Sequence, residues 1–442
     1  MPKRVLIVTY YWPPSGGSGV QRWLKFAKYL PELGWDVTVA APQDADYELT
    51  DETLITEVPE SVTVLRVPIR EPYAAFRTLT GSASRRAQTG ATASDSSKPS
   101  PLKRFAYWIR ANFFVPDPKI LWVKPTTAAL RHAHDREPFD VVVTTGPPHS
   151  VHLIGRELKT AFPELLWAVD IRDPWSKFDV HLDFNPGRRA RSKNRQLERD
   201  CLREADLVLG TAFSMPALLE PFDKGKYVTI TNGYDAADFG LDDAEYPPSR
   251  DRFHLYHTGL LTASRNPVAC WRALALLCER DAGFAERLHI HLVGTVDEVV
   301  RRSLDQHDGL RGKWTITPWV DHTELLRRYR EADAFLLCPN QTDNAKAQIN
   351  GKVFEYLAMR RPVLHVGPYD ADNTTVLDAA HAGLTVPPGD VEGAVAAIEN
   401  IASGKFAASP HAFNQQVIER YDRRATARQL SDVLHAHLAK RR

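Results

Sequence analysis

The chain has 442 residues, of which 43% are hydrophobic and 25% are charged, and its formal net charge is +1. This length exceeds one ordinary hydrophobic core and predicts two large domains, and the composition is typical of a soluble globular protein. A net charge so close to zero argues against a dedicated nucleic-acid binder. The cysteines lack the spacing of metal ligands, and no apolar run is long enough to span a membrane. We therefore expect a reduced, cytoplasmic protein that has no signal peptide and needs no metal.

The opening of the chain predicts a doubly wound α/β domain. An apolar strand over residues 5–11 leads into a glycine-rich turn, and apolar residues then recur at helical spacing from Val20 to Leu30. A second strand follows at residues 36–40. Further strands are predicted over residues 62–67, 141–145, 166–170, 207–211 and 228–231, with helices between most of them. Residues 1–235 are therefore expected to form a first Rossmann-like domain, which would bind the acceptor of any two-substrate reaction.

Two segments of this half have unusual compositions. Residues 81–101 are almost free of large apolar side chains and are predicted to be a mobile loop. The aromatic segment that follows, flanked by Lys103, Arg104 and Arg110, is either an amphipathic element that touches a membrane or a lipid acceptor, or a helix packed on its own domain. The basic run from Arg188 to Arg195 is either a solvated helix face or a weak, salt-sensitive contact with anionic lipid.

After a predicted linker at residues 232–250, the alternation of strands and helices begins again. Strands are predicted over residues 253–257, 288–293, 314–317, 334–338, 363–366 and 384–386, which gives a second Rossmann-like domain at residues 251–413. Residues 414–442 are expected to form one long helix that packs across both domains. Ligands of open α/β sheets bind at the carboxyl ends of the strands, so we expect both domains to face a central cleft there.

Three loops of the first domain carry candidate site residues. Gly16, Gly17 and Gly19 precede a helix, where backbone N–H groups suit an anion or sugar hydroxyls, although a tight packing turn explains them equally well. They do not complete a dinucleotide fingerprint, because Arg22 occupies the place of its third glycine. His149 follows a buried strand and is a better candidate than His152, which is expected on a helix surface.

The next strand ends in a charged segment. Asp170 and Asp173 are both expected at the carboxyl end of the sheet, where Arg172 is able to pair with one of them. A pair of this kind that only orders the loop is the alternative to a functional site. We take Asp173 as a candidate for orienting an acceptor.

The second domain contains a more specific pattern. Arg265 stands just before a helix that begins near Pro267, where a cation beside helix N–H groups suits a diphosphate. Asn350, Gly351 and Lys352 stand at the start of another helix, and Glu355 lies one turn further on, where its carboxylate is able to accept two ribose hydroxyls. A surface carboxylate is the alternative for Glu355, and its apolar neighbours argue against it.

These motifs resemble those of the retaining glycosyltransferases of family 4, which have the GT-B architecture, and the resemblance covers nearly the whole chain. It rests on the segments YYWPPSGGSGVQR, TGPPHS, DIRDPW, GLLTASRNP and, most specifically, GKVFEYLAMRRPVL. Similar proteins transfer sugars from nucleotide donors to saccharide or lipid-linked acceptors, often for bacterial surface polysaccharides. The resemblance implies the same class of reaction here.

The resemblance also implies roles for individual residues. Arg265 and Lys352 would neutralise the donor diphosphate, Glu355 would hold the ribose, and the loop of Gly16 to Gly19 would lie by the phosphates and the acceptor. Members often have a second glutamate eight positions before Glu355, which falls at Ala347 here. The side chains able to substitute for it by hydrogen bonding are Asn344, Gln348 and Asn350.

The resulting hypothesis is transfer with retention of configuration and electrostatic stabilisation of the leaving group by Arg265 and Lys352. His149 would bind the transferred sugar. No divalent metal is required, and Asp370 and Asp372 are taken as loop or sugar-contact residues. Trp319 and Val320 come just after a predicted strand and are candidates for flanking the base. Two alternatives stay open, a nucleotide-sugar 2-epimerase of the same fold and a degenerate, non-catalytic partner protein.

Overall fold

The computed structural model describes residues 2–47, 49–69, 101–177, 186–239, 251–409 and 411–441. The chain divides into two compact units, one formed by Met1–Thr231 with Thr426–Arg442 and the other by Asn232–Ala425. The predicted mobile loop at residues 81–101 lies outside the described residues except for its last position. Among the described helices, none combines the length and the apolar character needed to cross a bilayer.

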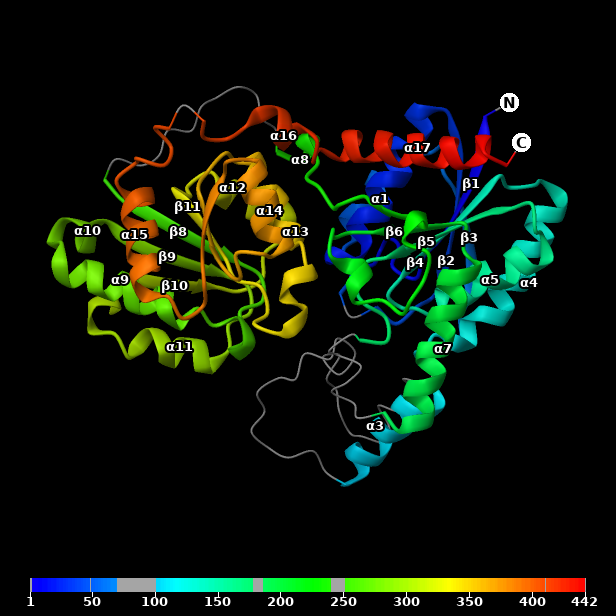
Figure 1. Cartoon of the computed structure of the whole chain (residues 1–442), viewed down its shortest axis with the longest axis horizontal. Coiled ribbons are helices and arrows are strands. Elements are labelled where there is room, and N and C mark those ends of the chain that lie inside the picture. Colours follow the sequence, from blue (N-terminus) through cyan, green and yellow to red (C-terminus); the bar gives the residue numbers. More distant parts are fainter. Residues whose placement is uncertain are drawn as a thin grey trace. The chain divides into compact units, whose positions relative to one another are not determined.

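The first unit is built on a parallel sheet of seven strands in the order β3-β2-β1-β4-β5-β6-β7 (Figure 1). The strands are β1 (Lys3–Val8), β2 (Trp35–Gln43), β3 (Thr63–Pro68), β4 (Val141–Gly146), β5 (Leu166–Ile171), β6 (Leu207–Gly210) and β7 (Tyr227–Thr229). The helices include α1 (Ser18–Tyr29), α3 (Pro101–Phe113), α4 (Ile120–Arg136), α5 (Val151–Ala161), α7 (Arg188–Glu204) and α17 (Arg423–Ala439). Strands buried on both faces need apolar residues at every position, which is why the sequence of β4 begins with three valines.

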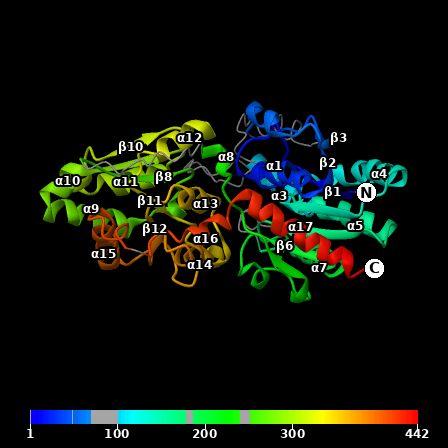
Figure 2. The same cartoon turned by 90° about the horizontal axis from the view of Figure 1, so that it is seen from above.

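Each face of this sheet is covered by different helices. Apolar residues of α1 and α17 pack in one cluster with alternate strand residues such as Val5 and Ile7. The next residues along β1, Leu6 and Val8, are equally buried and lie on the opposite face. The contacts of α4 with β3 and of α5 with β4 and β5 place these two helices on that opposite face. Figure 2 shows α17 lying along the unit that contains β1.

The second unit contains a parallel sheet of six strands in the order β10-β9-β8-β11-β12-β13. The strands are β8 (Phe253–Thr258), β9 (Leu288–Val293), β10 (Trp314–Thr317), β11 (Ala334–Leu337), β12 (Val363–Val366) and β13 (Gly383–Val386). The helices are α8 (Ala236–Phe239), α9 (Val268–Arg280), α10 (Ala282–Arg287), α11 (Glu298–Asp305), α12 (His322–Tyr329), α13 (Gly351–Ala358), α14 (Asp372–Ala379), α15 (Val391–Ala402) and α16 (Gln415–Glu419). The predicted fold class is confirmed, since each unit is a doubly wound Rossmann-like domain.

The predicted strands all overlap observed ones, and β9, β10 and β12 have the predicted bounds. The end of the chain differs, because the single predicted helix is divided into α16 and α17. Tyr234 and Asp422 form a short parallel bridge, in which Tyr234 N–H donates to the Tyr421 carbonyl (3.1 Å) and Arg423 N–H donates to the Tyr234 carbonyl (2.8 Å). Backbone groups committed to this bridge are lost to the helix, so the helix is interrupted there.

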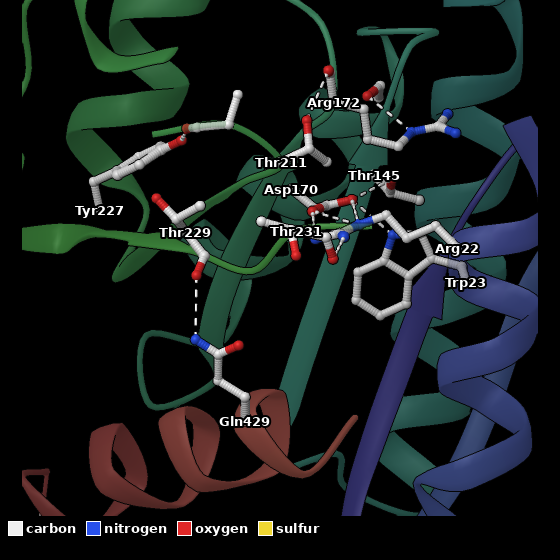
Figure 3. A network of polar contacts seen from close by, with 12 residues as sticks. Arg22, Trp23, Thr145, Asp170, Arg172, Thr211, Tyr227, Thr229, Thr231 and Gln429 are labelled. Carbon is white, nitrogen blue, oxygen red and sulfur yellow. Dashed lines mark hydrogen bonds and ion pairs between the residues drawn. The ribbon is translucent and has the colours of Figure 1, made fainter. Parts of the chain in front are cut away.

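A buried ion pair connects α1, β4 and β5 of the first unit with the segment that follows β7 (Figure 3). Arg22 on α1 donates from Nη2 to Oδ1 of Asp170 on β5 (2.9 Å) and from Nη1 to the carbonyl of Thr231 (3.0 Å). Trp23 Nε1 and Thr145 Oγ1 both donate to Asp170 Oδ2 (2.7 Å each). Burial alone raises the pKa of the Asp170 carboxyl, but the charge of Arg22 and these hydrogen bonds outweigh burial and lower it.

We predict that Asp170→Ala reduces the free energy of unfolding by about 3–5 kcal/mol, because it leaves the buried guanidinium of Arg22 without its counter-charge. The measurement is urea denaturation followed by circular dichroism. Glu298→Ala is the control, since its i,i+4 pair with Arg302 is exposed and contributes about 0.3–0.5 kcal/mol. Equal effects of the two substitutions would contradict the role of the buried pair.

The lowered pKa values of four histidines predict that the folded state loses stability in acid. Burial lowers the pKa of His152, His257 and His291 to about 3 and that of His365 to about 4. The unfolded chain binds protons at these groups near pH 6.5, whereas the folded chain does not, so stability falls as the pH drops below about 6.5.

We expect each of these groups to contribute a slope of up to about 1.4 kcal/mol per pH unit between their unfolded and folded pKa values. Thermal melting between pH 8 and pH 4.5 measures the effect. His291→Asn, at a half-buried ring stacked on Tyr256, should make the slope shallower. A melting temperature that is constant from pH 7 to pH 5 would exclude this linkage.

Candidate functional site

The strand order reverses once in each sheet, between β1 and β4 in the first and between β8 and β11 in the second. The two loops that leave such a point diverge to opposite faces of the sheet and open a crevice at the carboxyl ends of the strands. In the second unit these loops follow Thr258 of β8 and Leu337 of β11. The predicted Arg265 lies on the first of them.

Arg265 spans the reversal point of the second sheet. Its Nε donates to Oδ1 of Asn340 (2.6 Å), which follows β11, and its Nη1 donates to the Leu260 carbonyl (3.3 Å). Both acceptors are neutral oxygens. Burial lowers the pKa of the guanidinium, although not enough to discharge an arginine.

Lys352 reaches the same place from the first turn of α13. Its Nζ donates to the carbonyl of Thr258, the last residue of β8. Burial lowers the pKa of this ammonium to about 8, the nearby charge of Arg265 lowers it as well, and Glu355 opposes the shift. Within the described part of the chain, neither Lys352 nor Arg265 forms an ion pair with a carboxylate. Two adjacent cations that form no ion pair suit an external anion.

Glu355 is anchored to the same strand end. Its Oε2 accepts from Tyr329 Oη (3.0 Å), and its Oε1 lies 3.3 Å from His322 Nε2. Thr258 Oγ1 lies 3.0 Å from Tyr329 Oη and 2.9 Å from Tyr356 Oη. The side chain of Thr258 therefore belongs to the network that positions Glu355, while its carbonyl holds Lys352. The carboxylate keeps 24% of its side-chain surface exposed, so a ligand is able to reach it.

Asn350 and Gly351 form the entrance to α13. Asn373, which is fully buried, accepts from the Asn350 N–H (3.0 Å) and donates to Asn350 Oδ1 (2.8 Å). This reciprocal pair fixes the residue that precedes the helix. Gly351 is exposed, and a Cβ added there would meet no atom within 4 Å. The open surface leaves the positive end of α13 accessible to an anion.

The glycine loop of the first unit is less free than its sequence suggests. The Gly16 N–H donates to the Leu49 carbonyl (2.8 Å), so it is not available to a ligand. Gly17 is the N-cap residue of α1 with a φ of 80°, a conformation that favours glycine. The carbonyl of Gly19 accepts from Arg172 Nη1 (2.6 Å).

Arg172 joins this loop to the end of β4. Besides the Gly19 carbonyl, it donates from Nε to the Gly146 carbonyl (3.2 Å) and from Nη2 to the Pro147 carbonyl (2.7 Å). Arg172 therefore donates to backbone carbonyls and not to Asp170 or Asp173, the pairing that the sequence allowed. Arg22 takes Asp170, because it projects from α1 directly onto β5, and Asp170 has a structural role.

Asp173 differs from Asp170 in having no partner of this kind. Its half-buried carboxylate receives no hydrogen bond from the residues that the structure describes. Burial raises its pKa, and the charge of Arg172 partly offsets that rise. A carboxylate of this kind, beside a loop held in place by Arg172, suits a hydroxyl donor.

His149 and His152 are both fully buried. The ring of His149 stacks on Trp175, with centroids 4.9 Å apart and an angle of 6° between the planes. The expected surface position of His152 is wrong, because its Nδ1 lies 3.0 Å from Thr144 Oγ1 beneath the helix. A sugar is able to reach His149 only if this loop moves, so its binding role stays a prediction.

No group of three or more histidine, cysteine or carboxylate side chains in the described ranges is arranged to hold a metal. Asp370, on an exposed loop, pairs with Lys346 (2.5 Å), and Asp372 is buried at the start of α14. Trp319 follows β10 with 60% of its surface exposed.

The comparisons with known proteins agree with this architecture. Residues 16–233 match the family model described as a glycosyl transferase 4-like domain, and residues 254–403 match the model of glycosyl transferases group 1. The chain is a GT-B glycosyltransferase. No curated protein matches its sequence.

Solved structures show the same fold at low sequence identity. Sucrose-phosphate synthase from Thermosynechococcus elongatus is 14% identical, with 99% of this chain and 100% of that chain covered and a TM-score of 0.61. An E. coli structure described as trehalose-6-phosphate bound with UDP-2-fluoro glucose is 12% identical (98% and 99% covered, TM-score 0.61). A UDP-forming trehalose-phosphate synthase from Burkholderia xenovorans, in complex with glucose-6-phosphate, is 13% identical (98% and 100% covered, TM-score 0.61).

The sequence analysis did not single out several residues that contact the candidate site residues. Asn340 directly follows a predicted strand, so its position alone was a usable signal. His322 and Asn373 act across separate elements on Glu355 and Asn350, and no spacing in the sequence connects them. Ala347 is buried, with 3% of its surface exposed.

We predict that the glycosyltransferase binds a nucleoside diphosphate more weakly as the pH rises above about 8. The ammonium of Lys352 attracts the anion only while protonated, and bound diphosphate raises its pKa, so affinity falls by up to about tenfold per pH unit above the pKa of the free protein. Calorimetric titration between pH 7 and pH 9.5 measures this. Lys352→Arg should flatten the profile, and parallel profiles for both proteins would contradict the assignment.

Proposed function

We propose that this glycosyltransferase transfers a sugar from a nucleotide-sugar donor to a saccharide or lipid-linked acceptor, with retention of anomeric configuration. The observation that supports the proposal best is the pair of cations, Arg265 and Lys352, beside Glu355 at one end of the second sheet. Two cations beside a helix N-terminus suit a diphosphate, and a carboxylate one helical turn further on suits the ribose hydroxyls.

The donor half of the reaction is electrostatic. As the bond between the anomeric carbon and the diphosphate breaks, negative charge develops on the leaving oxygen, and Arg265, Lys352 and the N–H groups at Gly351 stabilise it. Glu355 accepts hydrogen bonds from the ribose hydroxyls, and Asn350 holds the helix entrance in position. Because two side-chain cations neutralise the diphosphate, the proposed transfer needs no divalent metal.

The acceptor half is assigned to the first unit. Asp173 accepts a hydrogen bond from the acceptor hydroxyl and orients it, and the loop of Gly16, Gly17 and Gly19 lies beside the substrates. The departing phosphate takes the acceptor proton on the face from which it leaves, which gives retention without a covalent intermediate. His149 contacts the transferred sugar after movement of its loop.

The similar structures support this choice of substrates. One is described with UDP-2-fluoro glucose, and another is UDP-forming and is described with glucose-6-phosphate. We propose a cytoplasmic enzyme of the family 4 type that acts in surface-polysaccharide synthesis. The 2-epimerase and the non-catalytic partner protein are the alternative outcomes of the test below.

The test is a thermal-shift screen with UDP, GDP, dTDP and ADP. A ligand at a hundredfold excess over its dissociation constant stabilises the folded state by about 2.7 kcal/mol, so the correct base should give a clear shift. We expect Glu355→Ala to reduce this shift, and Gly351→Val to abolish it by blocking the helix entrance. Gly283→Ala, on α10 at the opposite edge of the sheet, is the control.

Turnover then separates the three functions. A retaining transferase is supported by three results together. The donor is consumed only when acceptor extract is added, the activity persists in EDTA, and the product keeps the anomeric configuration. Conversion of donor without acceptor indicates an epimerase. A protein that gives no shift with any of the four nucleotides would leave the non-catalytic alternative.

A further inference from the structure

Three aromatic side chains form an exposed cluster on α3. The exposed fractions are 56% for Phe105, 48% for Trp108 and 69% for Phe113. The rings of Phe105 and Trp108 stack with centroids 6.1 Å apart, and Trp108 meets Phe113 edge-on at 5.8 Å. Isolated exposed aromatic residues are common, but a contiguous group on one helix marks an interaction surface.

The start of α7 carries a row of arginines at helical spacing. Arg188, Arg191, Arg195 and Arg199 line one hollow of about 420 Å³ together with Ser192 and Gln196. Arg199 is neutralised by Glu220 (2.8 Å), whereas the more distant Arg195 lies 4.0 Å from the same carboxylate. Arg188 has no acidic partner among the described residues, so positive charge is concentrated toward the beginning of the helix.

The helices that carry the aromatic cluster and the arginine row contact each other. Oδ1 of Asn112 on α3 accepts from the N–H of Gly187, which precedes α7 (2.8 Å). Figure 1 shows α3 against the beginning of α7, where both helices extend beyond the sheet. Residues 105–113 and 188–196 together contain six basic and no acidic residues, namely Arg110, Arg188, Arg189, Arg191, Lys193 and Arg195. The whole chain has a net charge of only +1, so this is a local excess.

The same helix is tied to the loop that carries Asp173. Trp175 Nε1 donates to Asn194 Oδ1 on α7 (2.7 Å), and the Ser176 N–H donates to Glu198 Oε2 (3.1 Å). The arginine row and the proposed acceptor loop therefore share one support. An acceptor held at a surface on α7 would be delivered close to that loop.

We propose that α3 and the first half of α7 form a single docking surface for an anionic lipid bilayer. The aromatic rings enter the interface between headgroups and acyl chains, and the arginines bind the headgroup phosphates. Association is peripheral and sensitive to salt, because most of these charges are exposed. The link to Asp173 rests on the proposed function, whereas the lipid surface itself does not. A lipid-binding surface close to Asp173 favours a lipid-linked acceptor over a free saccharide.

The test is flotation of the full chain with vesicles of phosphatidylcholine, with or without 30% phosphatidylglycerol. We expect binding only to the anionic vesicles, and release in 0.5 M NaCl. Each removed charge weakens binding by about fivefold, so Arg188→Gln/Arg191→Gln/Arg195→Gln should weaken it by about 100-fold. Phe105→Ser/Trp108→Ser/Phe113→Ser should weaken it too and make the remainder more sensitive to salt.

The control is Arg301→Gln/Arg302→Gln/Arg311→Gln, which removes three exposed arginines of the second unit and should bind as the native protein does. Melting curves and the nucleotide shift of each variant verify that the fold and the donor site are intact, so loss of flotation is distinguishable from failure of the proposed function. The proposal is overturned if neither vesicle binds, if the control and the α7 variant float equally, or if an oligonucleotide binds the surface more tightly than anionic vesicles do.

Discussion

The Arg22–Asp170 ion pair has 1% and 0% of its side-chain surface exposed, and the loops of the first unit are arranged around it. It connects α1 to β5, and its hydrogen bonds reach Thr145 on β4 and Thr231 beyond β7. A carboxylate taken out of water is tolerated only when donors surround it, and here a guanidinium, an indole and a hydroxyl do so. This charge is therefore satisfied within the first unit.

The second unit has the opposite arrangement at the equivalent edge. Arg265 and Lys352 are held by neutral oxygens of β8 and of the loops that follow β8 and β11, and burial, together with the nearby charge of Arg265, lowers the pKa of Lys352. Two adjacent cations held in this way repel each other in the free protein. The two units therefore differ in how they hold charge. Arg22 and Asp170 neutralise each other in the first unit, whereas Arg265 and Lys352 contact only neutral oxygens in the second.

The proposed surface of α3 and α7 differs from both of these charge arrangements. Arg188, Arg191 and Arg195 on α7 and the three aromatic rings on α3 are exposed, so this surface contributes little to the folded core. The hydrogen bonds from Trp175 and Ser176 nevertheless connect α7 to the segment that contains Asp173. Binding at a membrane and orientation of an acceptor would in this way depend on the same helix.

The sequence by itself determined the two doubly wound domains, because parallel strands buried on both faces leave apolar runs such as Val141–Gly146 that are readable without a structure. The sequence also indicates that Arg265 and Lys352 lie near helix starts and that Glu355 lies one turn into a helix, since these positions follow from local spacing. Tertiary structure alone decided the partners. Arg22 and not Arg172 pairs with Asp170, His152 is buried and not on a surface, and Asn373 supports Asn350, because each contact joins elements far apart along the chain. Side-chain reach across a sheet depends on packing, and no pattern within one segment encodes it.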